Sequence, residues 1–176
     1  MPGVCPVLLL SGALELLSAC GEQSADELLA AAQVAAAASD SVNAEAATAT
    51  ESYERFLESF PQDSRGDDVL RDLGRLYRQQ GEMETAIDYY RRLLREHPDS
   101  DYGAEAQFMV AFIYEEHLGD LDQARAGYAR VIEDFPGTEL ALSAERLLPH
   151  VGKNPEEWVP FEDDHQAAAA NPGSTE

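Results

Sequence analysis

Lysine is almost absent from this 176-residue chain: Lys153 is the only one, and the other basic residues are arginines. Basic residues are few altogether, with 12 Lys and Arg against 34 Asp and Glu and a formal net charge of −22. A chain of this charge is repelled by phosphate backbones, so nucleic acid is not an expected partner. The shortage of lysine has two open interpretations, adaptation to high salt or a GC-rich genome that favours Arg and Ala.

Cysteine and histidine are also scarce, and the chain lacks the motifs of catalytic sites. No cysteine or histidine stands at metal-ligand spacing with another. There is no glycine-rich phosphate loop, no nucleophile elbow, and no pair of acids that stands out from the general acidic excess. The sequence therefore predicts a protein that is not an enzyme and holds no cofactor and no metal. The residues concerned are Cys5, Cys20, His97, His117, His150 and His165.

Glycine and proline stand mainly between stretches rich in Ala, Leu, Glu and Arg, a composition that favours helix. One pattern, Ala-x3-Tyr followed by a closing Pro, occurs three times with steps of 37 and then 38 residues. A period of this size indicates one helical hairpin per repeat, stacked into an α-solenoid. The sequence thus predicts an all-α binding scaffold. The equivalent positions are Ala49, Tyr53 and Pro61, then Ala86, Tyr90 and Pro98, then Ala124, Tyr128 and Pro136.

The middle repeat has the fullest pattern. Its apolar residues Leu70, Leu73 and Tyr77 recur at helical spacing and predict a buried stripe. Gly74 has no side chain, so we expect a partner helix to approach closely there, and Gly81 is expected to end the first helix. The third repeat follows the same pattern with a hairpin turn one residue longer, at residues 117–120, which should change only the local geometry.

The first repeat is degenerate. Its first helix is expected in the Ala-rich run around residues 25–38, where Ser24 and Glu27 have the spacing of a capping box. Alanine favours helix but offers little surface to bury, so this hairpin is predicted to be the least stable.

These repeats resemble tetratricopeptide repeats. The middle one matches the pattern Leu-Gly-x2-Tyr…Gly…Ala-x3-Tyr…Pro at its main positions, except that Leu70 replaces the opening Trp. The resemblance covers residues 43–148 and implies a short TPR-type α-solenoid of about three hairpins plus a capping helix. The stretched spacing after each Pro is similar to periplasmic tetratricopeptide lipoproteins. Those families include the scaffold lipoprotein of the outer-membrane β-barrel assembly machinery and the Tol-Pal-associated cell-division coordinator.

The N-terminal residues 4–19 are apolar apart from Glu15, and they end in Leu-Ser-Ala-Cys at Cys20. The run is too short for a permanent bilayer-spanning helix and has the length of a signal-peptide core. Its end resembles the lipobox of bacterial lipoproteins, which implies cleavage before Cys20 and attachment of diacylglycerol to its sulfur. Gly21 carries no acidic retention signal, so the resemblance implies the outer membrane. Glu15 and the lack of a preceding Lys or Arg leave open a hydrophobic first helix of a cytosolic protein.

The predicted organisation has four parts. A signal peptide (1–19) and an anchor or linker (20–24) precede the helical repeats (25–148), and an acidic, mostly disordered tail follows (149–176). The repeats divide at about 25–61, 62–98 and 99–136, with a cap at 138–148 that begins after Thr138. Within the tail, the apolar residues 158–161 either dock on the solenoid or present a short peptide to a partner.

A partner-binding groove is predicted from the first helices of the repeats, which in this architecture line the concave face. The arginines Arg71, Arg75 and Arg78 recur at i, i+4 and i+7, and the third repeat has Phe108 and Phe112 at corresponding positions. This combination suits a protein or peptide that is acidic or carboxylate-ended and has apolar anchors. Alternatively, the arginines pair with neighbouring acids as a solvated face, and the phenylalanines pack between hairpins.

Together these features predict a non-enzymatic protein–protein interaction scaffold. The resemblance places it as a lipid-anchored protein of the bacterial outer membrane, on the periplasmic side, supporting envelope or outer-membrane protein assembly. Two alternatives stay open: a subunit of the β-barrel assembly machinery, and a soluble cytosolic adaptor built from the same repeats.

Overall fold

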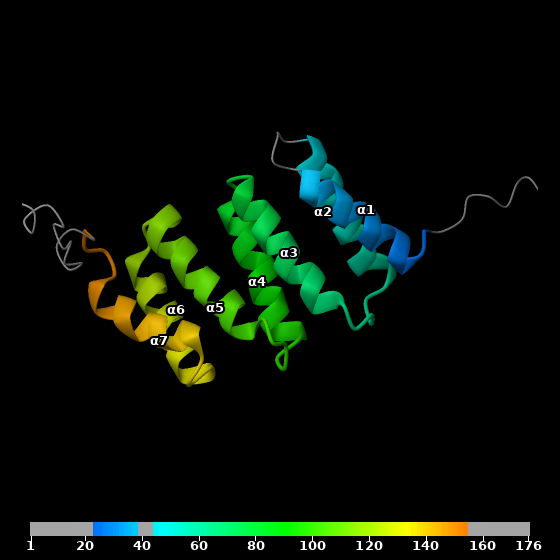
Figure 1. Cartoon of the computed structure of the whole chain (residues 1–176). Helices are drawn as coiled ribbons and strands as arrows, with labels where there is room; N and C mark the ends of the chain where they lie inside the picture. Colours follow the sequence, from blue (N-terminus) through cyan, green and yellow to red (C-terminus); the bar gives the residue numbers. More distant parts are fainter. Residues whose placement is uncertain (1–22, 39–43, 155–176) are drawn as a thin grey trace, which may run out of the picture. The chain divides into compact units, whose positions relative to one another are not determined.

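The computed structural model describes residues 23–38 and 44–154, and every regular element among them is a helix (Figure 1). The all-α class is therefore confirmed. The chain divides into two compact units, Met1–Gln62 and Asp63–Glu176, and each is described by itself. Cys20 and the apolar residues 158–161 lie outside the described residues. None of the helices in the described ranges combines the length and apolar character needed to cross a bilayer.

The first unit is one helical hairpin, α1 (Ala25–Ala38) and α2 (Ala44–Ser59). The predicted capping box is confirmed, because the Ser24 amide donates to the Glu27 carboxylate at 2.8 Å and the Glu27 amide to Ser24 Oγ at 3.3 Å. The helices bury a small core against each other; the prediction that this hairpin is the least stable stays a prediction. The buried apolar residues of the two helices are Leu28, Leu29, Ala32, Ala49, Tyr53, Phe56 and Leu57.

The second unit contains two hairpins and a final helix. Helices α3 (Gly66–Gln79) and α4 (Met83–Glu96) pack as one hairpin, and α5 (Gly103–Ile113) and α6 (Leu121–Asp134) pack as the next. The two hairpins stack through α4 and α5. Helix α7 (Glu139–Leu147) covers α6 and also contacts α5, so it closes the stack at this end (Figure 1).

Each hairpin of the second unit has a tight contact between its helices at a glycine. A Cβ atom on Gly74 would lie 2.7 Å from the ring of Tyr90 on α4, which confirms the predicted close contact. In the next hairpin, a Cβ on Gly127 of α6 would lie 2.7 Å from Ala111 Cβ and 3.0 Å from its Cα. A side chain at Gly127 would meet the backbone of α5, and one at Gly74 would displace the buried ring of Tyr90, so both positions favour glycine.

The turns between paired helices differ by one residue, as predicted. Gly81 follows α3 with a φ of +84°, a left-handed conformation that favours glycine. After α5, the extra residue is absorbed in a π-helical turn, Tyr114–Leu118, which ends at Gly119 with a φ of +68°. The Asp120 amide then donates to the Tyr114 carbonyl at 2.9 Å. The hairpin keeps its packing because the insertion widens one turn of helix instead of shifting the register.

The C-terminal end of the stack is longer than expected. The predicted N-cap is confirmed, since Thr138 Oγ1 accepts a hydrogen bond from the Ala141 amide at 3.1 Å. However, the ordered structure extends beyond residue 148 through a 3₁₀ turn, Leu148–His150, to Val151, which is 4% exposed and belongs to the core. Arg125 donates to the Val151 carbonyl at 3.2 Å. Pro149 lies in this 3₁₀ turn and Gly152 follows with a φ of +81°, so residues 149–152 of the predicted tail form a turn that returns to the hairpin.

Candidate functional site

The predicted groove residues lie on the first helices of the two hairpins of the second unit, the arginines on α3 and the phenylalanines on α5. Their environments differ so strongly that they cannot share one role. The structure distinguishes side chains that hold the fold together from side chains that remain open to a partner.

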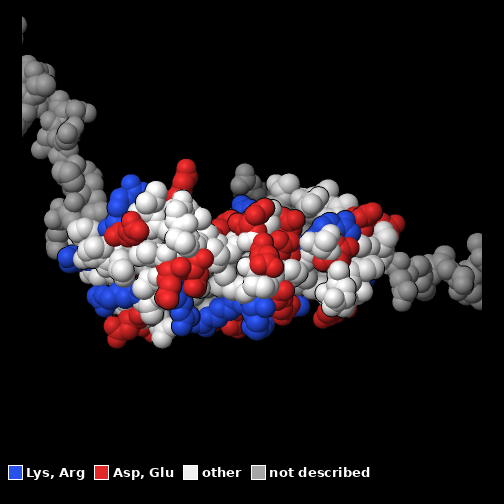
Figure 2. All heavy atoms as spheres, turned by 90° about the horizontal axis from the view of Figure 1, so that it is seen from below, with Lys and Arg blue, Asp and Glu red and all other residues white. Residues whose placement is uncertain are grey.

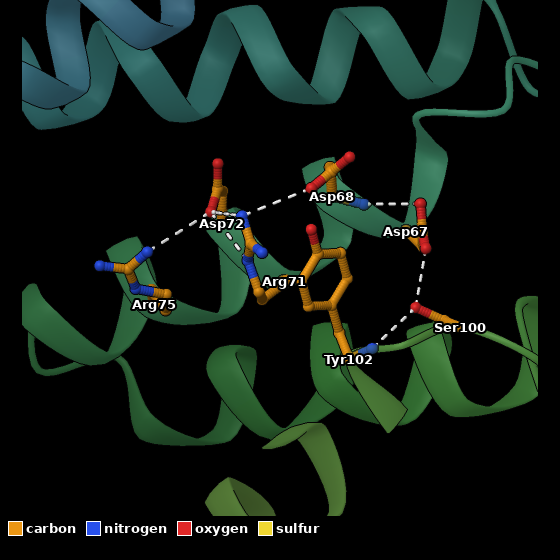
Figure 3. A network of polar contacts seen from close by, with 7 residues as sticks. All are labelled: Asp67, Asp68, Arg71, Asp72, Arg75, Ser100 and Tyr102. Carbon is orange, nitrogen blue, oxygen red and sulfur yellow. Dashed lines mark hydrogen bonds and ion pairs between the residues drawn. The ribbon is translucent and has the colours of Figure 1, made fainter. Parts of the chain in front are cut away.

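Arg71 is committed to contacts within the protein. Its guanidinium pairs with Asp72 at 3.0 Å and Asp68 at 3.5 Å, and it lies over the ring of Tyr102 with 3.9 Å to the centroid (Figure 3). Its side chain is only 19% exposed. Burial acts to lower the pKa of Arg71, but the Asp72 carboxylate opposes it and the net pKa is raised. For Arg71, the alternative interpretation therefore holds, in which the arginine pairs with neighbouring acids of its own helix.

The contacts of Arg71 belong to a network that joins successive hairpins. Ser100, in the segment before α5, donates from Oγ to the Asp67 carboxylate at 2.7 Å and accepts from the Tyr102 amide at 3.1 Å. Figure 3 shows the Tyr102 hydroxyl pointing toward Asp68, and this carboxylate raises the pKa of Tyr102. The network therefore fixes the start of α5 against α3, and with it the position of the α5 side chains.

Arg75 and Arg78 are less constrained. Arg75 is 53% exposed, and its ion pair with Asp72 is long at 3.6 Å. Arg78 lies beside Tyr90, and neither Arg78 Nε nor the Tyr90 hydroxyl, both buried, has a hydrogen-bond partner among the described residues. Burial raises the pKa of Tyr90 to about 12. Of the three predicted arginines, Arg75 is thus the one that presents its charge to solvent.

The two predicted phenylalanines also differ in their surroundings. Phe108 packs edge-on against Tyr128, with ring centroids 5.3 Å apart, and belongs to the core of the third hairpin. Phe112, one turn further on α5, lines a cavity of about 400 Å³ between α5, α6 and the segment after α7. Leu121 and Leu147 add apolar surface to this cavity, and Lys153 adds a cation. Phe112 is therefore the predicted anchor site that remains accessible.

Glu115 also lines this cavity, and its hydrogen bonds there were not predicted from the sequence. Its carboxylate accepts from the Tyr128 hydroxyl at 3.0 Å and from the Gly152 amide at 3.1 Å. Burial, and then Glu115, raise the pKa of Tyr128. The spacing in the sequence could have indicated this inward position of Glu115, since it follows the buried Ala111 by four residues and shares its helix face.

The arrangement is suited to binding. In the part of the chain that the structure describes, no group of three or more His, Cys, Asp or Glu side chains is placed to hold a metal ion. The cavity combines apolar walls with one cation and the carboxylates of Glu115 and Glu116, the former occupied by hydrogen bonds. Such a site can receive an apolar side chain and orient a polar group beside it.

Comparison with known families agrees with the architecture. The tetratricopeptide repeat family model matches residues 68–100 and 105–138, so the hairpins α3–α4 and α5–α6 are similar to tetratricopeptide repeats. The fold is accordingly a short TPR-type α-solenoid with a capping helix, as the sequence predicted. No curated protein matches the chain. Tetratricopeptide repeats are typically non-enzymatic scaffolds for protein partners, and a protein-interaction role follows for this chain.

The different roles of Arg71 and Arg75 can be tested by stability. Replacing Arg71 with Ala leaves Asp68 and Tyr102 without this cation and leaves Asp72 its long pair to Arg75, and should lower the free energy of unfolding by about 1–3 kcal/mol. The matched change Arg75→Ala removes a solvent-exposed pair, which should cost less than about 1 kcal/mol. Urea unfolding followed by circular dichroism measures both. Equal effects of the two substitutions would show that Arg71 does not fasten the hairpins.

Proposed function

We propose that this protein is a lipid-anchored scaffold of the bacterial outer membrane that faces the periplasm and supports envelope or outer-membrane protein assembly. The tetratricopeptide repeats support the scaffold role. The sequence around Cys20 supports the anchor: a short apolar run that closes in Leu-Ser-Ala-Cys has the form of a lipoprotein signal. Acyl chains at Cys20 would bind the membrane because each buried methylene contributes about 0.8 kcal/mol, and more than one chain gives stable attachment.

The cavity lined by Phe112 is the proposed partner site, and it is the observation that supports this function most directly. It offers apolar surface at the end of a repeat stack, to which α5 contributes Phe112 and α7 contributes Leu147. The proposed partner is a protein or peptide segment with an apolar anchor residue and an acidic or carboxylate group. Arg75, whose charge is largely exposed, supplies a cation for the acidic group of the partner. It lies on α3, which is the first helix of its hairpin, as α5 is of the next.

Two alternatives compete with this proposal. The stretched repeats are also compatible with a subunit of the β-barrel assembly machinery, although the described residues contain three hairpins where that lipoprotein family carries about five. A soluble cytosolic adaptor would use the same repeats without an anchor. Fractionation separates the adaptor from the lipoprotein, and identification of the bound partner separates the two envelope functions.

The anchor is tested by substitution of the two cysteines. Cys20→Ser removes the sulfur that would carry diacylglycerol, so the protein should move from the membrane fraction to the soluble fraction and lose labelling by radioactive fatty acid. Cys5→Ser is the control, since this cysteine would be removed with the signal peptide, and it should change neither property. A Cys20→Ser protein that stays in the membrane fraction would remove the lipoprotein proposal and favour another mode of attachment.

The partner site is tested by the double substitution Arg75→Glu with Phe112→Ala. Capture of the partner from an envelope extract should be lost, because both the cation and the apolar wall are removed, while circular dichroism shows unchanged helicity. The control Arg146→Glu with Leu142→Ala makes the same chemical changes at exposed positions of α7 and should bind normally. Undiminished capture by the Arg75 and Phe112 double variant would contradict the assignment of this site.

A further inference from the structure

A second groove lies on the other helices of the repeats, between α4 and α6, and has a volume of about 350 Å³. Its floor is formed by α5, where Gln107 donates to the Gly127 carbonyl at 3.3 Å. Ala126 and Gly127 have little or no side chain, so the groove stays open between the longer side chains on either side. This groove is distinct from the cavity at Phe112, and the two have no lining residue in common.

The charge of this groove is opposite to that of the chain. Three of its ten lining residues are arginines and none is acidic, although the chain has 34 acidic and 12 basic residues. Arg91 and Arg130 form no ion pair with Asp or Glu among the described residues, and Arg95 contacts Glu96 at 3.3 Å. Figure 2 shows cationic side chains gathered along the lower edge of one face, with acidic side chains over its centre. Two groove arginines that pair with no carboxylate among the described residues, in so acidic a protein, favour an anionic occupant.

Apolar side chains lie beside these cations. Leu94 and Tyr114 line the groove together with Val110. Arg91 donates to the Tyr114 hydroxyl at 3.0 Å and lies over its ring, 5.6 Å from the centroid, so the arginine is held at the edge of the groove. The groove can therefore receive aromatic or aliphatic side chains between carboxylates.

We propose that this groove is the docking site of an acidic segment of the same chain, residues 156–164. The segment lies outside the described residues, and its sequence, EEWVPFEDD, contains five acidic residues, one Trp, one Phe and no Lys or Arg. Its chemistry thus complements the groove in both respects, carboxylates for the arginines and aromatic rings for the apolar wall.

The chain length permits this contact. Val151 is held against α6, where Arg125 donates to its carbonyl at 3.2 Å. Arg130 is five residues further along α6, about 7.5 Å along its axis and about 140° around it, so the segment must cross the surface of α6 to reach the groove. The described residues end at Asn154, and the seven residues from Pro155 to Phe161 reach about 25 Å when extended. Because the segment is tethered, its effective concentration is in the millimolar range, so even a weak site is occupied.

Docking of this segment would occupy the arginine groove until a partner with a more favourable acidic segment displaces it. The contact does not depend on the membrane anchor or on the cavity at Phe112. It therefore gives the scaffold a second binding surface, which the chain itself covers.

The test uses the fluorescence of Trp158, which is the only tryptophan in the chain and so reports on this segment alone. In the purified full chain at low salt, its emission should be blue-shifted and protected from acrylamide, relative to a synthetic peptide of residues 155–176. Arg91→Gln with Arg130→Gln should abolish both effects. Salt at 1 M should also abolish the blue shift and the protection from acrylamide, because it shortens the Debye length from about 30 Å at 0.01 M to about 3 Å.

The control variant Arg75→Gln with Arg146→Gln removes the same charge from α3 and α7 and should leave the emission unchanged. Identical emission from the groove variant and this control would overturn the proposal, as would full exposure of Trp158 at low salt. A blue shift that grows with protein concentration would assign the segment to a second copy instead. A shift lost only in Phe112→Ala would assign it to the cavity at Phe112 instead.

Discussion

The second unit depends on close contacts between helices that only small side chains allow. Gly74 meets the ring of Tyr90, and Gly127 meets Ala111, in both cases at a distance that excludes a Cβ atom. Around these contacts Tyr90 and Tyr128 are fully buried, and the two hairpins stack on each other through α4 and α5. The positions of the surface side chains follow from this packing.

The same packing explains why arginines in one repeat have different roles. On α3, Asp68 and Asp72 stand within a turn of Arg71 and satisfy it, and Tyr102 from the next hairpin covers it. On α4 and α6, Arg91 and Arg130 face a groove without acids. Whether a cationic side chain is available to a partner therefore depends on its neighbours on adjacent helices. The net charge of the chain and the spacing of residues along one helix do not reveal those neighbours.

Much of the fold could be predicted from the sequence because its signals are local. The capping box at Ser24, the left-handed Gly81, the N-cap Thr138 and the close approach at Gly74 all depend on residues near in sequence or on a repeated pattern. The sites were harder to predict. The pairing of Arg71 with Tyr102, the hydrogen bond from the Gly152 amide to Glu115, and the contact of Arg125 with Val151 join residues 26 or more positions apart. Such contacts require the stacking of hairpins, which no local pattern specifies.

The claim that close glycine contacts determine the hairpin geometry is tested most directly by Gly127→Ala, measured as the free energy of unfolding in urea. Helix propensity alone predicts that alanine stabilises α6 by about 1 kcal/mol. The contact with Ala111 predicts the opposite sign, a net loss of about 1–3 kcal/mol, because the two helices must move apart. A Gly127→Ala protein that is as stable as the parent, or more stable, would contradict this account.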